Sequence, residues 1–150
     1  MDGWIFENKV KEYLDLNVDY IGSPWDINTF HFQTETVGNG GVSLRKVEKF
    51  INVCNSLTAS DYLRDYVDRE DLFFCKTMVV KSALKKPSVK QACGFSISGT
   101  GLQSYFIHKY NDGKLPMCLH AWHKDLKYWT KYIDLSEFNE TAKEPVKIPV

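Results

Sequence analysis

Two segments of the chain hold residue types that could bind and activate a polar ligand. The first is rich in glycine, whose backbone lets a ligand approach closely and adopts conformations that other residues avoid. The second is a pair of adjacent carboxylates, and a carboxylate can take a proton from a substrate hydroxyl. These residues are Gly38, Asn39, Gly40 and Gly41, followed by Glu70 and Asp71. Together they predict a site that binds a phosphorylated or sugar-like ligand and removes a proton.

Both segments also have simpler explanations. Asn39-Gly40 is a common hairpin turn, so the glycines could form only a tight turn before a helix. Glu70 and Asp71 would lie in the first turn of a helix capped by Asp68, where the helix dipole favours negative charge without any catalytic role. Neighbouring helical residues do not face each other, so one carboxylate could face a ligand while the other makes a structural contact. The glycine spacing matches neither of the common phosphate-binding fingerprints, so no mononucleotide or dinucleotide fold is indicated.

Histidines and tryptophans offer a second group of candidates. His120 and His123 have a spacing that could bind a metal ion from one helix, but a pair without a third ligand is also typical of surface histidines. Trp25, Trp122 and Trp129 could stack on a sugar ring or pack in the core. The sequence leaves both alternatives open.

Composition excludes some classes of protein. The 150 residues predict one domain, and a hydrophobic content of 43% is enough for a core. The formal net charge is zero, whereas a nucleic-acid-binding protein is expected to be basic. No apolar run approaches the ~20 residues of a membrane span, and the N-terminus lacks the pattern of a signal peptide. We therefore expect a cytoplasmic protein with buried thiols at Cys54, Cys75, Cys93 and Cys118.

The elements that would hold the candidate residues alternate between helix and strand. Helices are expected over residues 7–16, 42–57 with Ser43 as the N-cap, 60–67, 69–83 and 126–138, and strands over 19–25 and 102–110. Residues 27–36 read as a loop or edge hairpin, 89–95 are short and mixed, and turns are expected at 99–101 and 111–113. The alternation predicts an α/β fold, with a domain over residues 1–138 and a poorly ordered tail over 139–150.

Five blocks in a fixed order carry a family resemblance. They are Tyr20–Trp25, Val37–Arg45, Glu70–Phe74, Phe95-Ser96, and Leu115-Pro116 through His120-Ala121-Trp122. With these blocks the chain resembles a domain-of-unknown-function family regarded as glycosyltransferase-like, of the GT-A fold. The resemblance covers nearly the whole chain.

The resemblance implies a fold, a cofactor and roles for individual residues. The fold would be a mixed sheet flanked by helices, forming the acceptor-side part of a GT-A domain. Its nucleotide-binding N-terminal half would come from a longer gene product or from a partner chain. Gly38 to Gly41, with Trp25, would bind donor or acceptor, and Asp71 beside Glu70 would be the catalytic carboxylate. Asp2 and His120 would bind Mn²⁺ or Mg²⁺.

The implied reaction moves a sugar from a nucleotide-sugar donor to a glycan or other hydroxyl acceptor, with inversion if Asp71 is the base. His120 would bind metal as the neutral imidazole, so activity should fall in acid. Two alternatives belong to other classes: a non-catalytic carbohydrate-binding or assembly module, and a degenerate fragment without activity. The enzymatic hypothesis requires the backbone at Gly38–Gly41, the Asp71 side chain and the His120 imidazole to line a single cleft.

Overall fold

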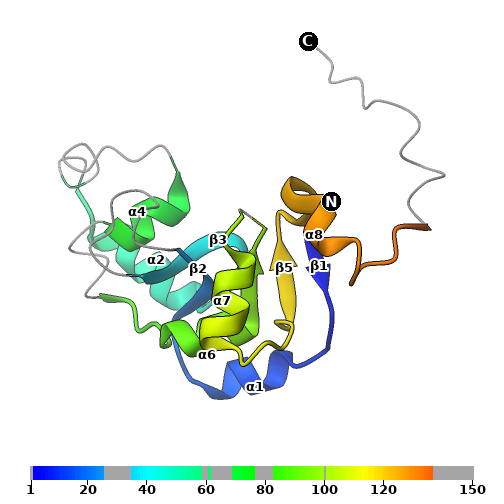
Figure 1. The fold of residues 1–150 in the computed structure, drawn as a ribbon. Helices are drawn as coiled ribbons and strands as arrows, with labels where there is room; N and C mark the ends of the chain where they lie inside the picture. The colour runs from blue at the N-terminus through cyan, green and yellow to red at the C-terminus, as the bar shows by residue number, and fades with distance from the viewer. Residues whose placement is uncertain are drawn as a thin grey trace, which may run out of the picture.

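The structure is a computed structural model that describes residues 2–25, 35–58, 61, 69–76, 83–99 and 101–136. The expected tail over 139–150 lies outside the described residues, as does the helix expected over 60–67 apart from residue 61. Of the loop expected over 27–36, residues 27–34 also lie outside, whereas Thr36 belongs to a strand. The described part is a mixed α/β fold with a small mixed sheet flanked by helices (Figure 1), which confirms the predicted class at this level.

Three short strands form one sheet in the order β1-β5-β4: β1 (Gly3–Ile5), β5 (Cys118–His120) and β4 (Ser96–Ser98). Strand β1 pairs antiparallel with β5, and β4 pairs parallel with β5. The carboxyl ends of β4 and β5 therefore meet at one edge, where Ser98 lies opposite His120.

The other two strands, β2 (Tyr20–Trp25) and β3 (Thr36–Arg45), form an antiparallel pair. Their register shifts on both sides of Ser23. The shift begins at Gly22, where a Cβ atom would lie 2.1 Å from the carbonyl oxygen of Asn39. Only glycine allows this close approach of the two backbones. We call this pair the β2–β3 ribbon.

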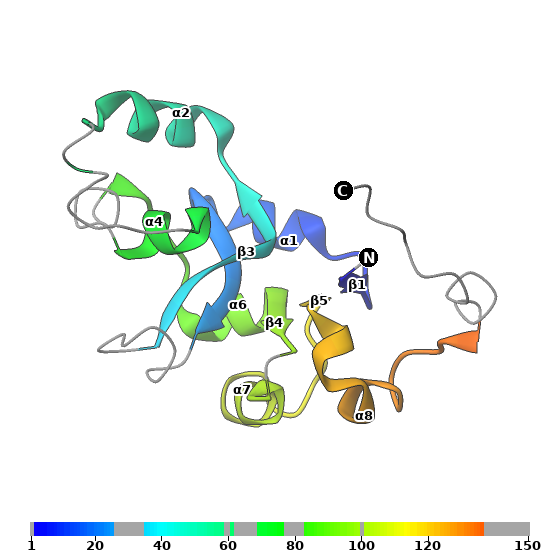
Figure 2. The ribbon, with the colours of Figure 1, turned by 90° about the horizontal axis from the view of Figure 1, so that it is seen from above.

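Helices surround the two sheets. They are α1 (Val10–Asp15), α2 (Val47–Ser56), α4 (Glu70–Lys76), α6 (Val89–Phe95), α7 (Gln103–Tyr110), the 3₁₀ helix η2 (Trp122–Asp125) and α8 (Leu126–Trp129). In Figures 1 and 2, α2 and α4 lie beside the β2–β3 ribbon, whereas α7 and α8 lie on the side of the three-stranded sheet. Among the described helices, none has the length and apolar content needed to span a bilayer.

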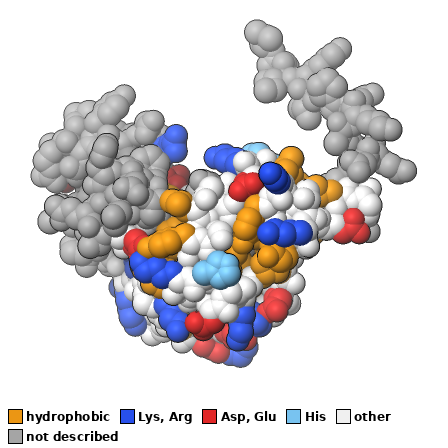
Figure 3. Space-filling view, in the orientation of Figure 1, with side chains coloured by type: hydrophobic (Ala, Val, Ile, Leu, Met, Phe, Trp, Pro, Cys, Tyr) orange, Lys and Arg blue, Asp and Glu red, His pale blue; other side chains and the backbone are white. Residues whose placement is uncertain are grey.

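Each sheet packs on an apolar cluster, and a further cluster of Ile21, Phe95, Met117 and Cys118 joins the two sheets. Ile97, Leu119 and Trp129 centre the core of the three-stranded sheet. Beside the β2–β3 ribbon, a second core is formed by Tyr20, Trp25, Leu72 and Cys75. Cys93 and Cys118 are also buried, whereas Cys54 is exposed, so the expectation of buried thiols is confirmed for three of the four cysteines. On the face drawn in Figure 3, acidic and basic side chains are interspersed, in keeping with the zero net charge.

Several predicted elements are wrong or shorter than expected. The helix expected from residue 42 begins at Val47, because Val42 to Arg45 belong to β3, which pairs with β2. Ser43 is therefore not an N-cap. The strand expected over 102–110 is helix α7, because Gln103, Phe106 and Ile107 are buried at helical spacing.

At the carboxyl end, the helix expected over 126–138 is only the short α8.

Residues 89–95, predicted as mixed, form helix α6. A capping box starts this helix: the Gln91 N–H donates to Ser88 Oγ and the Ser88 N–H donates to Gln91 Oε1. The turn expected at 111–113 is confirmed, with positive φ at Asp112 and Gly113.

Candidate functional site

The glycine-rich segment lies inside strand β3, in neither a tight turn nor an open loop. Gly38 is buried against α4, and a Cβ there would lie 1.8 Å from Cys75 Sγ. Gly41, three residues further on, is exposed, and its N–H donates to Asn39 Oδ1 at 3.1 Å. The segment therefore runs from tightly packed backbone at Gly38 to backbone open to a ligand at Gly41.

Asp71 joins the first turn of α4 to this segment. Its Oδ2 accepts from the Gly40 N–H at 3.2 Å, and its Oδ1 accepts from the Leu72 N–H at 2.8 Å. The helix can come this close because a Cβ at Gly40 would lie only 3.1 Å from the Asp71 Cβ. Both oxygens of a half-buried carboxylate are thus held in a fixed orientation.

Glu70 points to a different partner, as expected for adjacent positions on a helix. Its Oε1 accepts from the Arg45 guanidinium at 2.8 Å, and this hydrogen bond lowers the pKa of the Glu70 carboxyl. Arg45 lies over the Tyr20 ring at 5.2 Å and donates from Nε to Ser43 Oγ at 3.0 Å. Glu70 is therefore part of an ion pair that fixes α4 to β3.

His120 ends strand β5, and its ring is held from three sides. Its Nε2 lies 3.3 Å from Asp2 Oδ2, and its Nδ1 lies 3.4 Å from Ser98 Oγ. A Cβ at Gly41 would lie 2.1 Å from Nε2, so the imidazole packs directly against the Gly41 backbone. Burial lowers the pKa of His120, and the Asp2 carboxylate offsets this only in part. The lowered pKa favours the neutral form of the imidazole.

These contacts bring the sequence-predicted residues to one place. Gly40 contacts Asp71, the next residue Gly41 contacts His120, and His120 contacts Asp2. The Asp71 charge is near enough to oppose, in small part, the lowering of the His120 pKa by burial. The site lies at the carboxyl ends of the parallel strands β4 and β5, the edge where open α/β sheets bind ligands. Gly40, Gly41, Asp71, His120 and Asp2 are neighbours, whereas Gly38 is packed against Cys75 in the core. That these neighbours line one cleft, and the chemical role of each, stays a prediction.

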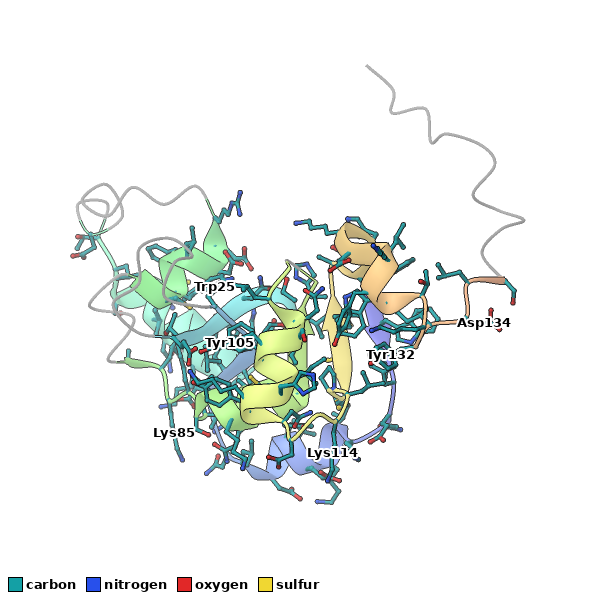
Figure 4. The ribbon with its side chains drawn as sticks, viewed as in Figure 1. Trp25, Lys85, Tyr105, Lys114, Tyr132 and Asp134 are labelled. Carbon is teal, nitrogen blue, oxygen red and sulfur yellow. The ribbon has the colours of Figure 1, made fainter. Side chains whose placement is uncertain are left out.

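Two other candidates lie differently. Trp25, with 7% of its surface exposed, packs with Leu72 and Cys75 at the end of β2 beside α4 (Figure 4). Its ring packs against the backbone at Gly38. To stack on a sugar, Trp25 would have to leave its contacts with Leu72 and Cys75. His123 is exposed in η2, a separate element from the β5 strand that holds His120.

Among the described residues, no group of three or more His, Cys, Asp and Glu side chains is close enough to hold a metal ion. Asp2 and His120 are a two-residue set, with 59% and 17% of their side chains exposed. A metal held there would need further ligands from a substrate or from water.

Sequence reasoning assigned no role to Arg45 or Ser98. Arg45 was noted only as the end of the glycine block, and nothing in its spacing from Glu70 predicts their ion pair. The strand that holds Ser98 could have been predicted, because Ser96-Ile97-Ser98 alternates polar and apolar residues as a short strand does. That alternation would have placed both serines on one face of a strand.

Comparison with known sequences adds one finding. A family model described as "Protein of unknown function (DUF5672)" matches residues 1–120. The chain belongs to the DUF5672 family. No curated protein and no solved structure matches it.

The extent of the match bears on the site. The DUF5672 segment ends at residue 120, so it includes every candidate site residue from Asp2 to His120. Helices η2 and α8 follow it. The candidate site of this DUF5672 chain is thus built entirely from the part that the family shares.

Proposed function

We propose that the chain takes part in the transfer of a sugar from a nucleotide-sugar donor to a hydroxyl acceptor, with inversion at the anomeric carbon. The observation that carries the proposal is the meeting of Asp71, the Gly40–Gly41 backbone and the His120–Asp2 pair at the carboxyl ends of β4 and β5. In the same proposal, the mixed sheet and its helices form the acceptor-side part of a GT-A fold.

Asp71 is the base in this proposal. Two backbone N–H groups orient its carboxylate, and each oxygen keeps a further lone pair for a substrate. Asp71 takes the proton of the acceptor hydroxyl while that oxygen attacks the anomeric carbon. The new glycosidic bond forms as the bond from the sugar to the nucleoside diphosphate breaks, and the diphosphate leaves with the bonding electrons.

The donor would approach the exposed backbone at Gly41. The His120 ring fills the space that a side chain at Gly41 would take, so a sugar or phosphate would lie beside the imidazole on the part of this backbone that stays exposed. Arg45 and Glu70 keep α4 in place, which fixes the distance between Asp71 and this backbone. Glu70 is therefore a positioning residue here, and its ion pair leaves Asp71 as the carboxylate for proton transfer.

Asp2 and His120 fit a divalent cation such as Mn²⁺ or Mg²⁺. They offer one carboxylate oxygen and one neutral imidazole nitrogen 3.3 Å apart, and the other ring nitrogen of His120 has a partner in Ser98. When bound, the cation offsets the negative charge of the leaving diphosphate.

The proposal is tested first by binding. Calorimetry of the full chain with uridine and guanosine diphosphate sugars, with and without Mn²⁺, should reveal a donor whose binding needs the metal. Saturable binding of free glycans without any metal-dependent donor binding would instead favour a non-catalytic carbohydrate-binding module.

The decisive variant is Asp71→Asn. It keeps the shape of the side chain but removes its basicity, so transfer should fall ~10²- to 10⁴-fold while donor binding persists. Asp112→Asn is the matched control, because Asp112 is exposed in a turn at φ 50°, a conformation that asparagine tolerates. Unchanged turnover in Asp71→Asn would overturn the assignment of the base.

A further inference from the structure

Ser98 holds the side of the His120 ring that faces away from Asp2. Ser98 lies in β4 directly opposite His120 in the parallel pair with β5. Its Oγ lies 3.4 Å from Nδ1, while Asp2 lies 3.3 Å from Nε2. Backbone contacts fix this placement, because the Gly99 N–H donates to the His120 carbonyl at 2.8 Å.

The surroundings of Ser98 suit a supporting role better than a reacting one. Only 7% of Ser98 is exposed, so its hydroxyl is closed off from a substrate. A Cβ at Gly99 would lie 2.6 Å from the Ala121 carbonyl oxygen, so the two chains are tightly packed just beyond the contact. Gly41 covers the ring as well, which leaves Nε2 as the nitrogen that faces Asp2.

A hydroxyl can serve the imidazole in either of two states because it both donates and accepts hydrogen bonds. Without a cation, Nε2–H can donate to Asp2 while the Ser98 hydroxyl donates to Nδ1. A cation held at Nε2 would require the imidazole proton to be on Nδ1, and Ser98 Oγ would then accept a hydrogen bond from Nδ1–H. An outer partner of this kind orients a metal-binding histidine and raises its basicity.

We propose that Ser98 is a positioning residue that lets His120 bind a divalent cation through Nε2. This inference rests on the proposed function, because that function puts the cation at Asp2 and His120.

The test is a Mn²⁺ titration of the full chain without any nucleotide-sugar, followed by the loss of the free-ion electron paramagnetic resonance signal. Ser98→Ala should weaken Mn²⁺ binding ~10- to 100-fold. Ser98→Thr keeps the hydroxyl and should restore most of the affinity.

Ser96→Ala is the matched control, since Ser96 lies two residues away in β4 and contacts Ser23 Oγ at 2.7 Å instead of a histidine. It should leave Mn²⁺ affinity unchanged. Circular dichroism melts of all variants separate a local loss of metal binding from unfolding.

A second readout follows the ring itself. The ¹⁵N signals of the His120 imidazole report which nitrogen carries the proton. Zn²⁺, a diamagnetic substitute for Mn²⁺ that imidazole binds well, should move that proton from Nε2 to Nδ1 in the wild-type chain. In Ser98→Ala the same Zn²⁺ concentration should leave more of the proton on Nε2. This readout does not depend on any transfer activity.

The outcomes distinguish the role of Ser98 from the existence of the metal site. If Asp2→Asn and His120→Gln abolish Mn²⁺ binding but Ser98→Ala binds as the wild type does, the role of Ser98 is wrong and the metal site stands. If neither Asp2→Asn nor His120→Gln changes Mn²⁺ binding, the metal site is wrong and the role of Ser98 falls with it.

Discussion

The β2–β3 ribbon and the three-stranded sheet meet at the candidate site, but they contribute to it in opposite ways. The ribbon brings backbone: Gly40 donates its N–H to Asp71, and Gly41 lies against the His120 ring. The three-stranded sheet brings side chains, with Ser98 and His120 at the ends of two parallel strands. The ribbon thus needs glycines at the site, because the side chains of Asp71 and His120 lie directly against its backbone.

This difference explains why three positions of strand β3 that face the other elements are glycine. At Gly38, Gly40 and Gly41 a Cβ would lie between 1.8 and 2.5 Å from its nearest neighbour. All three positions have ordinary φ angles, since positive φ occurs at Gly101 and Gly113 among the described glycines. At Gly38 and Gly41 glycine therefore allows the close approach of Cys75 in α4 and of His120 in β5, and backbone conformation is not the reason. At Gly40 the nearest atoms are the flexible ends of Glu70 and Arg45, so a Cβ there would be tolerated more easily.

The largest effect is expected from Gly38→Ala. The added Cβ would lie 1.8 Å from Cys75 Sγ, and Cys75 is only 2% exposed, so the core has little room to adjust. Overpacking of this kind should lower the free energy of unfolding by ~3 kcal/mol, measured by urea denaturation. In a Cys75→Ala background the same change should cost less, because the sulfur is gone. Equal costs in both backgrounds would show that the clash is not the cause.

The next largest effect is a loss of stability in acid at the end of the ribbon where Asp19 precedes β2. Asp19 Oδ2 accepts from the Lys85 N–H at 2.9 Å, and its Oδ1 lies 3.4 Å from Nζ of Lys46, the residue after β3. Burial raises the pKa of Asp19, but these two partners lower it more, so the pKa is below its usual value. The stabilisation is complete above pH ~4, the pKa of the unfolded chain, and is lost as pH falls through the folded pKa.

The matching variant is Asp19→Asn. It should cost ~2 kcal/mol of unfolding free energy at pH 7, the worth of hydrogen bonds to a charged group, and less near pH 3. Urea denaturation at the two pH values measures both numbers. A cost that stays the same at both would mean that the ionised carboxylate contributes nothing to holding the ribbon.

Gly41→Ala tests the junction of the two regions directly. The new Cβ would displace the His120 ring, so Mn²⁺ affinity should fall at least tenfold, or ~1.4 kcal/mol. The ring is partly exposed and can move, so the loss of stability should be smaller than at Gly38. A double-mutant cycle with His120→Ala, read by urea denaturation, isolates the contact. If Gly41→Ala is equally destabilising without the imidazole, the ring is not what makes glycine necessary.

The ribbon and the sheet also differ in how far the sequence predicted them. Strand β2 was predicted because apolar residues, Gly22 and Pro24 mark a short strand clearly. Strand β3 is not among the predicted strands, and its last four residues, 42–45, were assigned to a helix, because the apolar spacing from Leu44 onward fits a helix as well as a strand. Residues up to Arg45 form a strand because they pair with β2, and the local sequence does not indicate such long-range pairing.

For the site, the sequence predicted which residues gather but not how they are held. Asp71 and the glycines stand out by residue type and clustering, His120 by its spacing from His123, and Asp2 only through the family resemblance. The contacts that fix them, from Arg45 to Glu70 and from Ser98 to His120, join residues 25 and 22 positions apart. Sequence spacing carries no information on such pairs until the fold brings the strands and helices together.

The smallest effect is expected from Ser88→Ala, which tests how the three-stranded sheet is supported. Ser88 caps helix α6, and α6 runs directly into β4, the strand of Ser98. Loss of the cap should cost ~1 kcal/mol of unfolding free energy, with Mn²⁺ affinity unchanged because the far end of the helix stays packed in the core. Gln91→Ala removes the reciprocal hydrogen bond and should cost less than Ser88→Ala. If Ser88→Ala weakens Mn²⁺ binding as much as Ser98→Ala does, the placement of Ser98 depends on the whole helix and not on its pairing with His120.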